Sequence, residues 1–592
     1  MCGITAALGV IAPEDIELVR LSVSSLTHRG PDEEGFISGE KYALGHRRLA
    51  ILGDTNSGGQ PFKDDKNWLV YNGEIHNYVE LARDLRKLGH DIPAGSDVPV
   101  VAAALKEWGA DAIAKFDGFF AFVYVRPESK DALIARDIFG QKPLVFKKKP
   151  ALNGQILYIA SEEKSLQHGK KLTPDLNAGI GAAINGIYPV SPKSCFIDIK
   201  QFKPGITYQV SLTNGQLKEL NKNRSVEKKT KLRQPITEGV KNLLLTSISN
   251  RLRSDVPIGL LLSAGVDSGC IRALCTKEEV SYNFVFDNKG TSSEYPEVKE
   301  AFGQIHELSR VHLEYGSESD FHKTITRLQE AIGAPLLSAS LLALDALYSN
   351  AKSKDVHVLL SGQGADELFG GYNYYQDDNL NWISKKLDRI QKIGGWKNVP
   401  SDLRDLRKSN LLLETIRLKH PKSEQLNIPQ DYKSRRRYDI FGGPLSTMLW
   451  YEDRIAMHHS IEVRYPFLQP DLLSLTSALT LNELHLGNES KGLLKAALKD
   501  KLPPHLVSSS PKRGLPANEK YLIQRFPNIF SEGISFFGKY TNCNMELHLQ
   551  RLSLPNSLGR RESQVLFRIA CSGIWMQQYP SNIRIEPFRE KA

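Results

Sequence analysis

The chain has 592 residues and a formal net charge of +10, with 41% hydrophobic and 24% charged residues. This composition is ordinary for packed globular proteins and excludes global disorder. No apolar run approaches the roughly 18 residues that a membrane span needs, and the first residues lack the basic and apolar regions of a secretory signal. The six cysteines are too few and too scattered for a disulfide framework. These features predict a cytoplasmic protein.

The positive charge is concentrated in one segment. Residues 385–437 hold 15 Lys or Arg against 6 Asp or Glu. Such a segment can bind nucleic acid or a membrane surface, but the interleaved aromatic residues typical of single-strand binding are missing. We therefore interpret it as a solvated basic insertion, or as a lid near an anionic substrate, and expect no nucleic-acid partner.

The first part of the chain mixes strands and helices. Short apolar runs rich in aromatic and branched residues predict strands at 68–71, 119–124 and 156–160. Residues 81–88 and 100–108 instead carry apolar stripes at helical spacing. This mixture predicts a layered α+β domain over residues 1–213.

A polar and charged stretch at 214–235 predicts a linker to a second domain, 236–592. Residues 257–262 predict a buried strand that runs into the loop 263–268 (SAGVDS), and 356–360 run likewise into 361–364 (SGQG). Repeated strand, tight turn and helix predict a parallel α/β sheet. Beyond about residue 440 the pattern is mainly helical.

Cys2 is the first candidate catalytic residue. Removal of Met1 would place its thiol and a free α-amine on one residue, and an amine with a pKa of about 7.7–8.0 can take the thiol proton. A cysteine at position 2 is a weak signal alone. Four further segments follow it in order: 28–32 (HRGPD), 45–49 (GHRRL), 71–75 (YNGEI) and 95–97 (GSD).

Together these segments resemble the class II glutamine amidotransferases over roughly residues 2–170. The resemblance implies a four-layer α+β N-terminal-nucleophile glutaminase in which Cys2 attacks the side-chain amide of glutamine. Asn72 and the backbone amide of Gly73 would form the oxyanion hole. Arg48 would pair with the α-carboxylate of glutamine and Asp97 with its α-ammonium. The implied glutamine-binding residues are Arg48, Asn72, Glu74 and Asp97.

The loop 263–268 is not a Walker motif, which would end in Gly-Lys-Ser/Thr. Its small residues allow close approach of a phosphate, and its hydroxyls and the following helix supply donors. It resembles the pyrophosphate loop of the ATP pyrophosphatases, which form acyl-adenylates. Residues 361–372 (SGQGADELFGGY), 461–468 (IEVRYPFL) and Lys491 are similar to asparagine synthetase, so most of the chain resembles the glutamine-hydrolysing B-type asparagine synthetases.

That resemblance implies ATP and Mg²⁺ as cofactors and an adenine nucleotide alpha hydrolase-like fold for the second domain. The implied ATP-binding residues are Leu261, Ser263, Gly265, Asp267, Ser268, Phe286, Ser361 and Gly362. Asp267 and Asp366 would hold Mg²⁺, and Lys491 would stabilise charge on the α-phosphate. Asp287 and Glu462 are expected to be structural.

The sequence departs from the family pattern at the acceptor site. Gln363 occupies the acidic position of Ser-Gly-Glu/Asp-Gly, and glutamine cannot accept a proton near neutral pH. Residues 335–344 also lack the Thr-x-x-Arg with which some members bind aspartate. Candidates for a displaced base are Tyr374, Tyr375, Asp377 and Asp378. Ala264, Gly269 and Gln469 are lesser departures.

Three functions remain open. The first is an ATP-dependent, glutamine-hydrolysing amidotransferase that forms an amide from an acyl-AMP, with aspartate as the default acceptor or another carboxylate in its place. The second is a lactam-forming synthetase of the same family, and the third is a non-catalytic binding or regulatory homologue. The retained pocket of Cys2, Arg48, Asn72 and Asp97 favours the first. Its partners would be small molecules (glutamine, ATP and the acceptor). A homodimer is left open as an assembly state.

Overall fold

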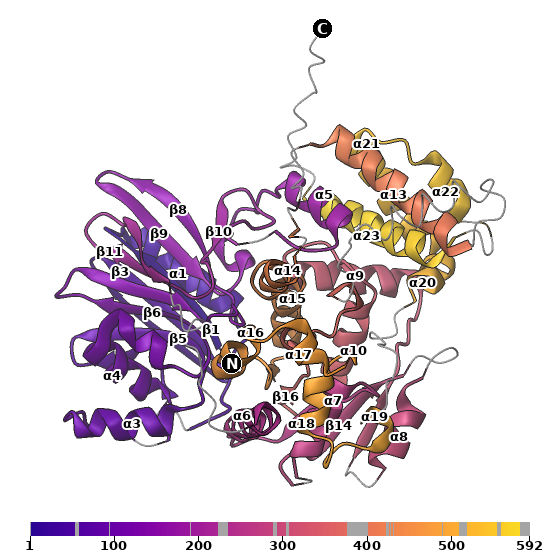
Figure 1. Ribbon diagram of the computed structural model, residues 1–592. Coiled ribbons are helices and arrows are strands. Elements are labelled where there is room, and N and C mark those ends of the chain that lie inside the picture. The colour runs from indigo at the N-terminus through magenta and orange to yellow at the C-terminus, as the bar shows by residue number, and fades with distance from the viewer. Residues whose placement is uncertain are drawn as a thin grey trace.

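The computed structural model folds into two halves that lie side by side, as Figure 1 shows. The structure describes residues 2–579 except for 54–57, 94, 190, 223–234, 277, 288–292, 304–306, 376–400, 422–425, 427, 430, 488, 508–517, 553 and 555–557. None of the helices described in these residues combines the length and the apolarity that a membrane crossing requires.

Two six-stranded antiparallel sheets form the first half. The first has the order β10-β8-β9-β1-β3-β2, with bounds Ile199–Gln201, Val145–Ala151, Gly154–Ala160, Cys2–Leu8, Tyr42–Arg48 and Glu33–Gly39. The second has the order β12-β11-β7-β6-β5-β4, with bounds Leu217–Lys222, Ile206–Ser211, Asp131–Arg136, Gly118–Arg126, Asn67–Ile75 and Phe62–Asp64. Strands β5, β6 and β9 confirm the three strands predicted from apolar runs.

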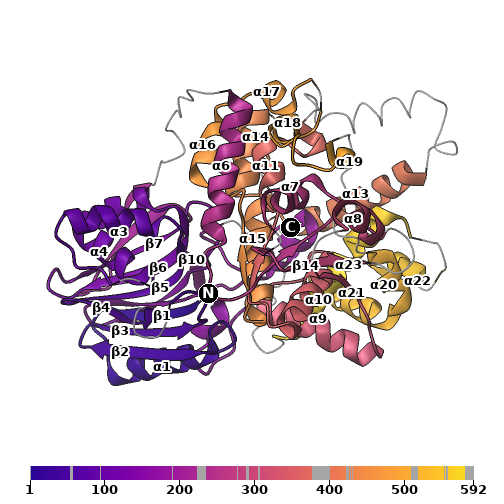
Figure 2. The same cartoon turned by 90° about the horizontal axis from the view of Figure 1, so that it is seen from below.

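The sheets stack face to face with helices on their outer sides, which gives four layers (Figure 2). Alternating apolar residues such as Ile4, Ala121 and Val123 fill the space between the sheets. Helix α1 (Pro13–Ser25) packs on the first sheet, and α4 (Val98–Trp108), with α3 (Tyr78–Lys87) against it, packs on the second. This is the expected four-layer α+β fold.

The expected linker is shorter than the sequence pattern suggested. Its early residues, Leu217–Lys222, form β12 at the edge of the second sheet, paired with β11. An edge strand needs only backbone pairing and one covered face, so its polar composition hid it from a search for apolar runs. Residues 223–234 of the predicted linker lie outside the described residues.

A five-stranded parallel sheet forms the centre of the second half and confirms the predicted α/β arrangement. Its order is β15-β14-β13-β16-β17, with bounds Leu308–Val311, Tyr282–Phe286, Ile258–Leu261, Val358–Leu360 and Glu462–Arg464. Strands β13 and β16 are neighbours and run parallel. The loops that follow them therefore emerge side by side at the carboxyl edge, where open α/β sheets bind ligands.

Helices surround this sheet and form a separate cluster beyond it (Figure 1). Those near the sheet are α6 (Ile236–Arg251), α7 (Val266–Leu274), α8 (Tyr295–Phe302), α9 (Glu318–Ile332), α10 (Ser340–Ser353), α11 (Ala365–Phe369), α14 (Tyr432–Phe441), α15 (Pro444–His458), α16 (Pro470–Ser477), α17 (Leu481–His485), α18 (Gly492–Ala497) and α19 (Pro504–Val507). The cluster comprises α13 (Ser401–Lys419), α20 (Glu519–Arg525), α21 (Pro527–Thr541), α22 (Glu546–Leu552) and α23 (Arg560–Gln577), and α5 (Leu176–Asn185) packs against α23.

The basic insertion contributes to the fold as well as to the surface charge. Its residues 385–400 lie outside the described residues, whereas α13 and part of α14 fall within it. The Arg436 guanidinium is buried and donates to the carbonyl oxygens of Glu367, Leu368 and Thr476 at 2.7–2.9 Å. This arginine connects α14 to α11 and to the end of α16. The expectation of a solvated insertion is therefore wrong for this part of the segment.

Candidate active sites

Cys2 and Asn72 come from different sheets and meet through a hydrogen bond. The backbone nitrogen of Cys2 donates to Oδ1 of Asn72 at 3.0 Å. The other polar atom of this side chain, Nδ2, is buried and has no hydrogen-bond partner among the described residues. A buried, unpaired donor is costly, and a developing oxyanion is a group that it could stabilise.

Gly73 lies next to this amide in a conformation that requires glycine. Its φ is +155°, and a Cβ there would lie 2.1 Å from the carbonyl oxygen of Phe119 on β6. Any side chain would therefore push β5 away from β6. Glycine keeps the strand, and with it the Gly73 backbone amide, beside the Cys2 pocket.

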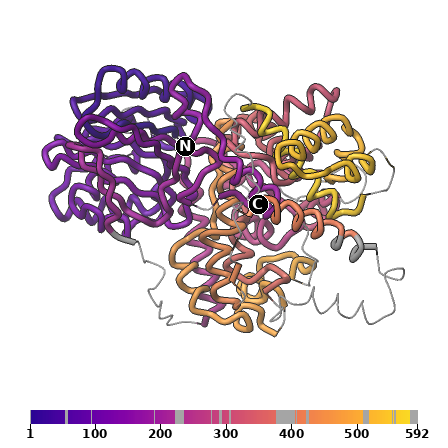
Figure 3. The backbone as a smooth tube through the Cα atoms, turned by 90° about the horizontal axis from the view of Figure 1, so that it is seen from above, coloured from indigo at the N-terminus to yellow at the C-terminus, as the bar shows by residue number. Residues whose placement is uncertain are grey.

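One pocket brings Cys2 together with most of the predicted glutamine-binding residues. Arg48, Glu74 and Asp97 line it together with Cys2 and Gly73. Antiparallel pairing of β1 with β3 places Arg48 directly opposite Cys2. Figure 3 shows that the N-terminal end of the first half faces the second half. Ser96, from the segment 95–97 noted in the sequence, also lines the pocket.

The thiol of Cys2 needs a base. Burial raises the pKa of Cys2 above its ordinary value, with smaller opposing effects that include Arg48. The thiol is therefore protonated at neutral pH, and only the thiolate is a strong nucleophile. The nitrogen of Cys2 is on the same residue and becomes an amine if Met1 is removed.

Asp97 is a buried carboxyl at the wall of this pocket. Its Oδ2 accepts hydrogen bonds from the Tyr71 hydroxyl at 2.8 Å and the Ile75 backbone at 2.9 Å. Burial nevertheless raises the pKa of Asp97 to about 7. A cation bound beside it would favour the ionised form, and an α-ammonium group is such a cation.

Arg48 is held rigidly. Nη1 donates to Glu33 at 2.8 Å, and Nη2 donates to the carbonyl oxygens of Leu52 and Gly53 at 3.2 and 2.7 Å. These contacts fix the plane of the guanidinium at the pocket wall.

The second half completes the lining of this pocket through β17. Glu462 lines the pocket, and its neighbour Arg464 forms ion pairs with both Glu462 (2.7 Å) and Glu74 (2.6 Å). All three side chains are buried. Glu462, which was expected to be nearer to structural than to catalytic, thus also lines the Cys2 pocket. Sequence gave no signal that a residue nearly 400 positions from Glu74 would share its site.

A second buried ion-pair network crosses between the halves at Arg29. Its guanidinium bonds the carbonyl oxygen of Cys2 at 3.1 Å, Glu162 at 2.8 Å and Asp453 on α15 at 2.9 Å. Next to Asp453, Arg454 pairs with Glu163 at 2.9 Å. Helix α15 thus contacts the residues around the nucleophile directly.

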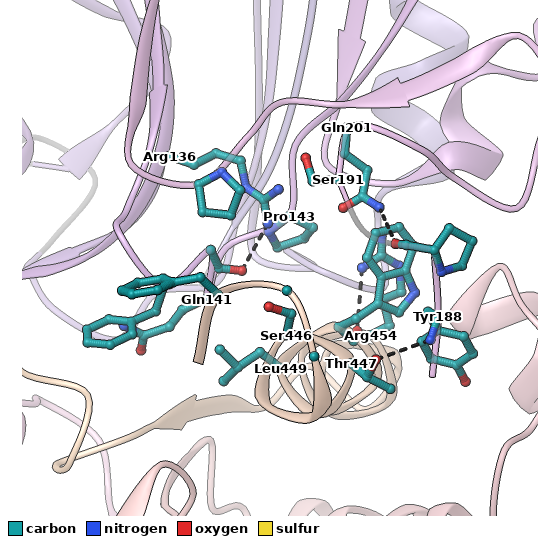
Figure 4. Close-up of a pocket in the computed structure, with 18 residues that line it drawn as sticks. Arg136, Gln141, Pro143, Tyr188, Ser191, Gln201, Ser446, Thr447, Leu449 and Arg454 are labelled. Carbon is teal, nitrogen blue, oxygen red and sulfur yellow. Dashed lines mark hydrogen bonds between the residues drawn. The ribbon is translucent and has the colours of Figure 1, made fainter. Parts of the chain in front are cut away.

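A cavity lies along the same boundary, shown in Figure 4. Arg136 donates to the carbonyl oxygens of Gly140, Lys142 and Phe202 and so shapes one wall. The backbone nitrogen of Tyr188 donates to the Thr447 hydroxyl at 3.1 Å across the boundary. None of the site residues predicted from sequence lines this cavity.

The loop after β13 is organised by its own hydroxyls. The Ser268 hydroxyl accepts from the backbone nitrogen of Ser263 at 3.0 Å, and the Ser263 hydroxyl accepts from that of Gly265 at 3.2 Å. Ala264 is absent from the residues with positive φ, so its methyl group is tolerated. A Cβ at Gly269 would lie 2.6 Å from Cδ1 of Leu506, so a larger residue there would require that side chain to shift.

Asp267, Asp366 and Lys491 converge on one point. Nζ of Lys491 lies 2.6 and 2.7 Å from the two oxygens of Asp267 and 2.6 Å from Asp366. The two carboxylates raise the pKa of Lys491 although its burial opposes this. Gly362 lies against Asp267, since a Cβ on it would lie 2.9 Å from the Cβ of Asp267. The loops after β13 and β16 therefore form one acidic site with a central cation.

The remaining predicted nucleotide residues lie at the same edge of the sheet. Leu261 ends β13, Phe286 ends the neighbouring β14, and Ser361 follows β16 directly. Gln469, a lesser departure, caps α16 by accepting from the Leu472 backbone at 2.7 Å.

Gln363 lies in the loop after β16, and two of the suggested displaced bases are engaged elsewhere. The hydroxyls of Tyr374 and Tyr375 both donate to Asp439, at 3.0 and 2.8 Å. Asp377 and Asp378 lie outside the described residues. The carboxylate that Gln363 does contact is Glu452 on α15, at 3.5 Å, and sequence reasoning missed it.

Comparison with known families agrees with this division. Residues 1–221 match the glutamine amidotransferase domain, and residues 239–532 match asparagine synthase. A glutaminase half joined to an ATP-using, amide-forming half defines a carbon–nitrogen ligase that takes its nitrogen from glutamine. Relatives that are similar to this chain over most of its length are named as glutamine-hydrolysing asparagine synthetases.

Relatives match over most of their length. Asparagine synthetase [glutamine-hydrolyzing] 1 of Bacillus subtilis is 27% identical over 86% of this chain and 85% of its own. Asparagine synthetase [glutamine-hydrolyzing] of Zea mays is 26% identical over 90% of this chain and 78% of its own. Identity at this level leaves the acceptor to be argued from the site.

Proposed function

We propose that this chain hydrolyses glutamine at Cys2 and transfers the ammonia to an acyl-adenylate formed on the second half, yielding an amide, AMP and pyrophosphate. The proposal rests on the presence of two sites in one chain. The first is the Cys2 pocket with its unpaired amide donor, and the second is the cluster of Asp267, Lys491 and Asp366. Buried ion pairs such as that of Arg464 with Glu74 connect the two halves.

In the first site the α-amine of Cys2 would take the thiol proton as sulfur attacks the glutamine amide carbon. The oxyanion would be stabilised by Nδ2 of Asn72 and the backbone amide of Gly73. Arg48 and Asp97 would hold the α-carboxylate and the α-ammonium. Ammonia leaves with the returned proton, and water then hydrolyses the thioester to glutamate.

In the second site the hydroxyls and backbone of Ser263, Gly265 and Ser268 would hold the pyrophosphate portion of ATP, with Ser361 and Gly362 beside the nucleotide. Leu261 and Phe286 would border the adenosine. Lys491 would neutralise charge that develops on the α-phosphate as the acceptor carboxylate attacks it.

Asp267 and Asp366 fit a magnesium ion chemically. Both carboxylates already approach one cationic nitrogen, and Mg²⁺ is commonly held by one or two carboxylates together with substrate phosphates. When bound, the ion would neutralise phosphate charge.

The default acceptor is aspartate, which would give asparagine. Gln363 in place of an acidic residue and the missing Thr-x-x-Arg support a different carboxylate as the alternative. We would measure pyrophosphate release with ATP, Mg²⁺ and glutamine across a panel of carboxylic acids that begins with L-aspartate. Release that depends on one acid, with equimolar amide, supports the proposal; no release with any acid refutes it.

A further inference from the structure

Gln363 is in contact with a carboxyl group that comes from a distant helix. Its Nε2 donates to Oε1 of Glu452 on α15 at 3.5 Å, a long hydrogen bond across 89 positions of sequence. Gln363 occupies the position where the family pattern has an acidic residue. A carboxylate is therefore in contact with residue 363, although it is not part of that residue.

Glu452 is enclosed almost completely. Its residue is 1% exposed, and Oε2 has no hydrogen-bond partner at normal distance among the described residues. Oxygen lone pairs that are not used by the fold remain able to accept a proton. Salt-bridging does not account for this carboxyl, since no cation pairs with it among the described residues.

The groups that face Glu452 are mostly neutral. Tyr348 on α10, Tyr465 after β17 and Tyr451 on α15 lie around it, and the carboxylates of Asp453 and Glu367 act on the same tyrosines. Burial raises the pKa of Glu452 to about 7, although hydrogen bonding by Tyr465 and Gln363 favours the ionised form. A general base works best when its pKa lies near the operating pH.

We infer that Glu452 replaces the missing acidic residue at position 363 as the proton acceptor for amide formation, with Gln363 orienting the incoming ammonia beside it. The inference rests on the proposed function and adds a residue to it. With its Nε2 engaged by Glu452, Gln363 keeps its side-chain oxygen as an acceptor for an N–H of ammonia.

The step balances without any further reactant. The ammonia lone pair forms the C–N bond at the carbonyl carbon of the acyl-adenylate, and the nitrogen of the adduct becomes positively charged. One N–H proton passes to the Glu452 carboxylate, directly or through one water. The C–O bond to AMP then breaks, AMP leaves with the electron pair, and the protonated Glu452 returns its proton to solvent.

The test uses the full-length protein with ATP, Mg²⁺, ammonium chloride and L-aspartate, or with whichever acid of the panel supports the strongest wild-type exchange. Two rates are measured: ATP–pyrophosphate exchange, which reports adenylation, and amide formation. Glu452→Gln keeps the size and hydrogen-bonding capacity of the side chain. We expect amide formation to fall about 100-fold or more, as loss of a general base predicts, while exchange changes by less than twofold.

A rescue variant separates a proton acceptor from a packing residue. The double variant Glu452→Gln with Gln363→Glu carries the carboxylate at position 363 in place of position 452. Its rate of amide formation should be at least tenfold higher than that of Glu452→Gln alone. At constant free ammonia, the wild-type rate should fall tenfold per unit below pH 7, and Glu452→Gln should lose that dependence. Glu219→Gln, which removes an exposed ion pair with Lys203, serves as control and should leave both rates within twofold.

The outcomes are distinguishable. If exchange occurs and Glu452→Gln forms amide at the wild-type rate, the inference is overturned and the proposed function stands. If the variant loses exchange and amide equally, and the double variant rescues neither, Glu452 is structural and the inference fails. If the wild type exchanges with no acid, the proposed function itself is wrong.

Discussion

Arg29 and Asp453 form a buried, two-pronged ion pair across 424 positions of sequence, with nitrogen–oxygen distances of 2.9 and 3.3 Å. The same guanidinium bonds the carbonyl oxygen of Cys2, and the residue before Asp453 is Glu452. Cys2 is therefore connected to Gln363 through a short series of direct contacts. Arg29 bonds Cys2 and Asp453, and Glu452, the residue before Asp453 on α15, bonds Gln363.

Asp453→Asn should uncouple the two reactions. The change leaves Arg29 with a single carboxylate, and breaking a buried pair commonly costs about 3–5 kcal/mol. We expect glutamine-dependent amide formation to fall at least tenfold while ammonium-dependent formation falls less than threefold. The midpoint temperature of thermal unfolding should fall by several degrees. Glu128→Gln, which removes an exposed pair with Lys66, is the control and should change neither. Equal losses with both nitrogen donors would contradict the coupling.

Cys2→Ala should abolish glutamine-dependent amide formation and leave ammonium-dependent formation largely intact, because the proposed nucleotide site lies on the other half. Steady-state assays with each nitrogen donor measure this. Intact-mass spectrometry should show that Met1 is absent from the active protein. Full activity in a protein that retains Met1 would rule out the α-amine as base.

The pKa of Asp97 predicts how glutamine affinity changes with pH. Its value of about 7 in the free site means that acidification below neutrality protonates the carboxyl and weakens its hold on an ammonium group. We expect kcat/KM for glutamine to fall about tenfold per unit below pH 7, mainly through KM.

Glutaric acid monoamide, which lacks the α-ammonium, provides the matched comparison for this prediction. Wild type should prefer glutamine over it strongly, and Asp97→Asn should lose most of that preference. A variant that still discriminates as the wild type does would place the ammonium site elsewhere.

Asp267→Asn and Asp366→Asn should each reduce ATP–pyrophosphate exchange by a factor on the order of a hundred, since lost stabilisation of phosphate charge is worth several kcal/mol. The basal glutaminase rate should change little. Asp500→Asn, an exposed carboxylate paired with Lys241, is the control. Exchange that survives both substitutions would show that the nucleotide binds elsewhere.

The fold class could be predicted because its signals are local. Strands such as β5 and β6 carry apolar runs, and the loop 263–268 follows a buried strand directly. Strand β12 was missed because an edge strand can be polar and still pair through its backbone.

The Cys2 pocket could be anticipated from short segments in order, whereas its wall from β17 could not. Glu462 and Arg464 occur in a segment that resembles the nucleotide half, and nothing local indicates that they reach Glu74. Glu452 shows the same limit. In the sequence it is an ordinary acidic residue of an amphipathic helix, and only the packing of α15 under Gln363 reveals that its carboxyl is buried without a cation.

Strand β17 also has a consequence for how such a chain can change over generations. The backbone nitrogen of Ser361, at the start of the nucleotide loop, donates to the carbonyl oxygen of Arg464 at 3.0 Å, while the side chain of Arg464 holds Glu74 of the other half. A substitution at position 464 therefore alters two active sites at once. Recombination that exchanged only one half with that of a distant relative would bring together two surfaces that had not adapted to each other. The two halves are expected to diverge in step, as one inherited unit.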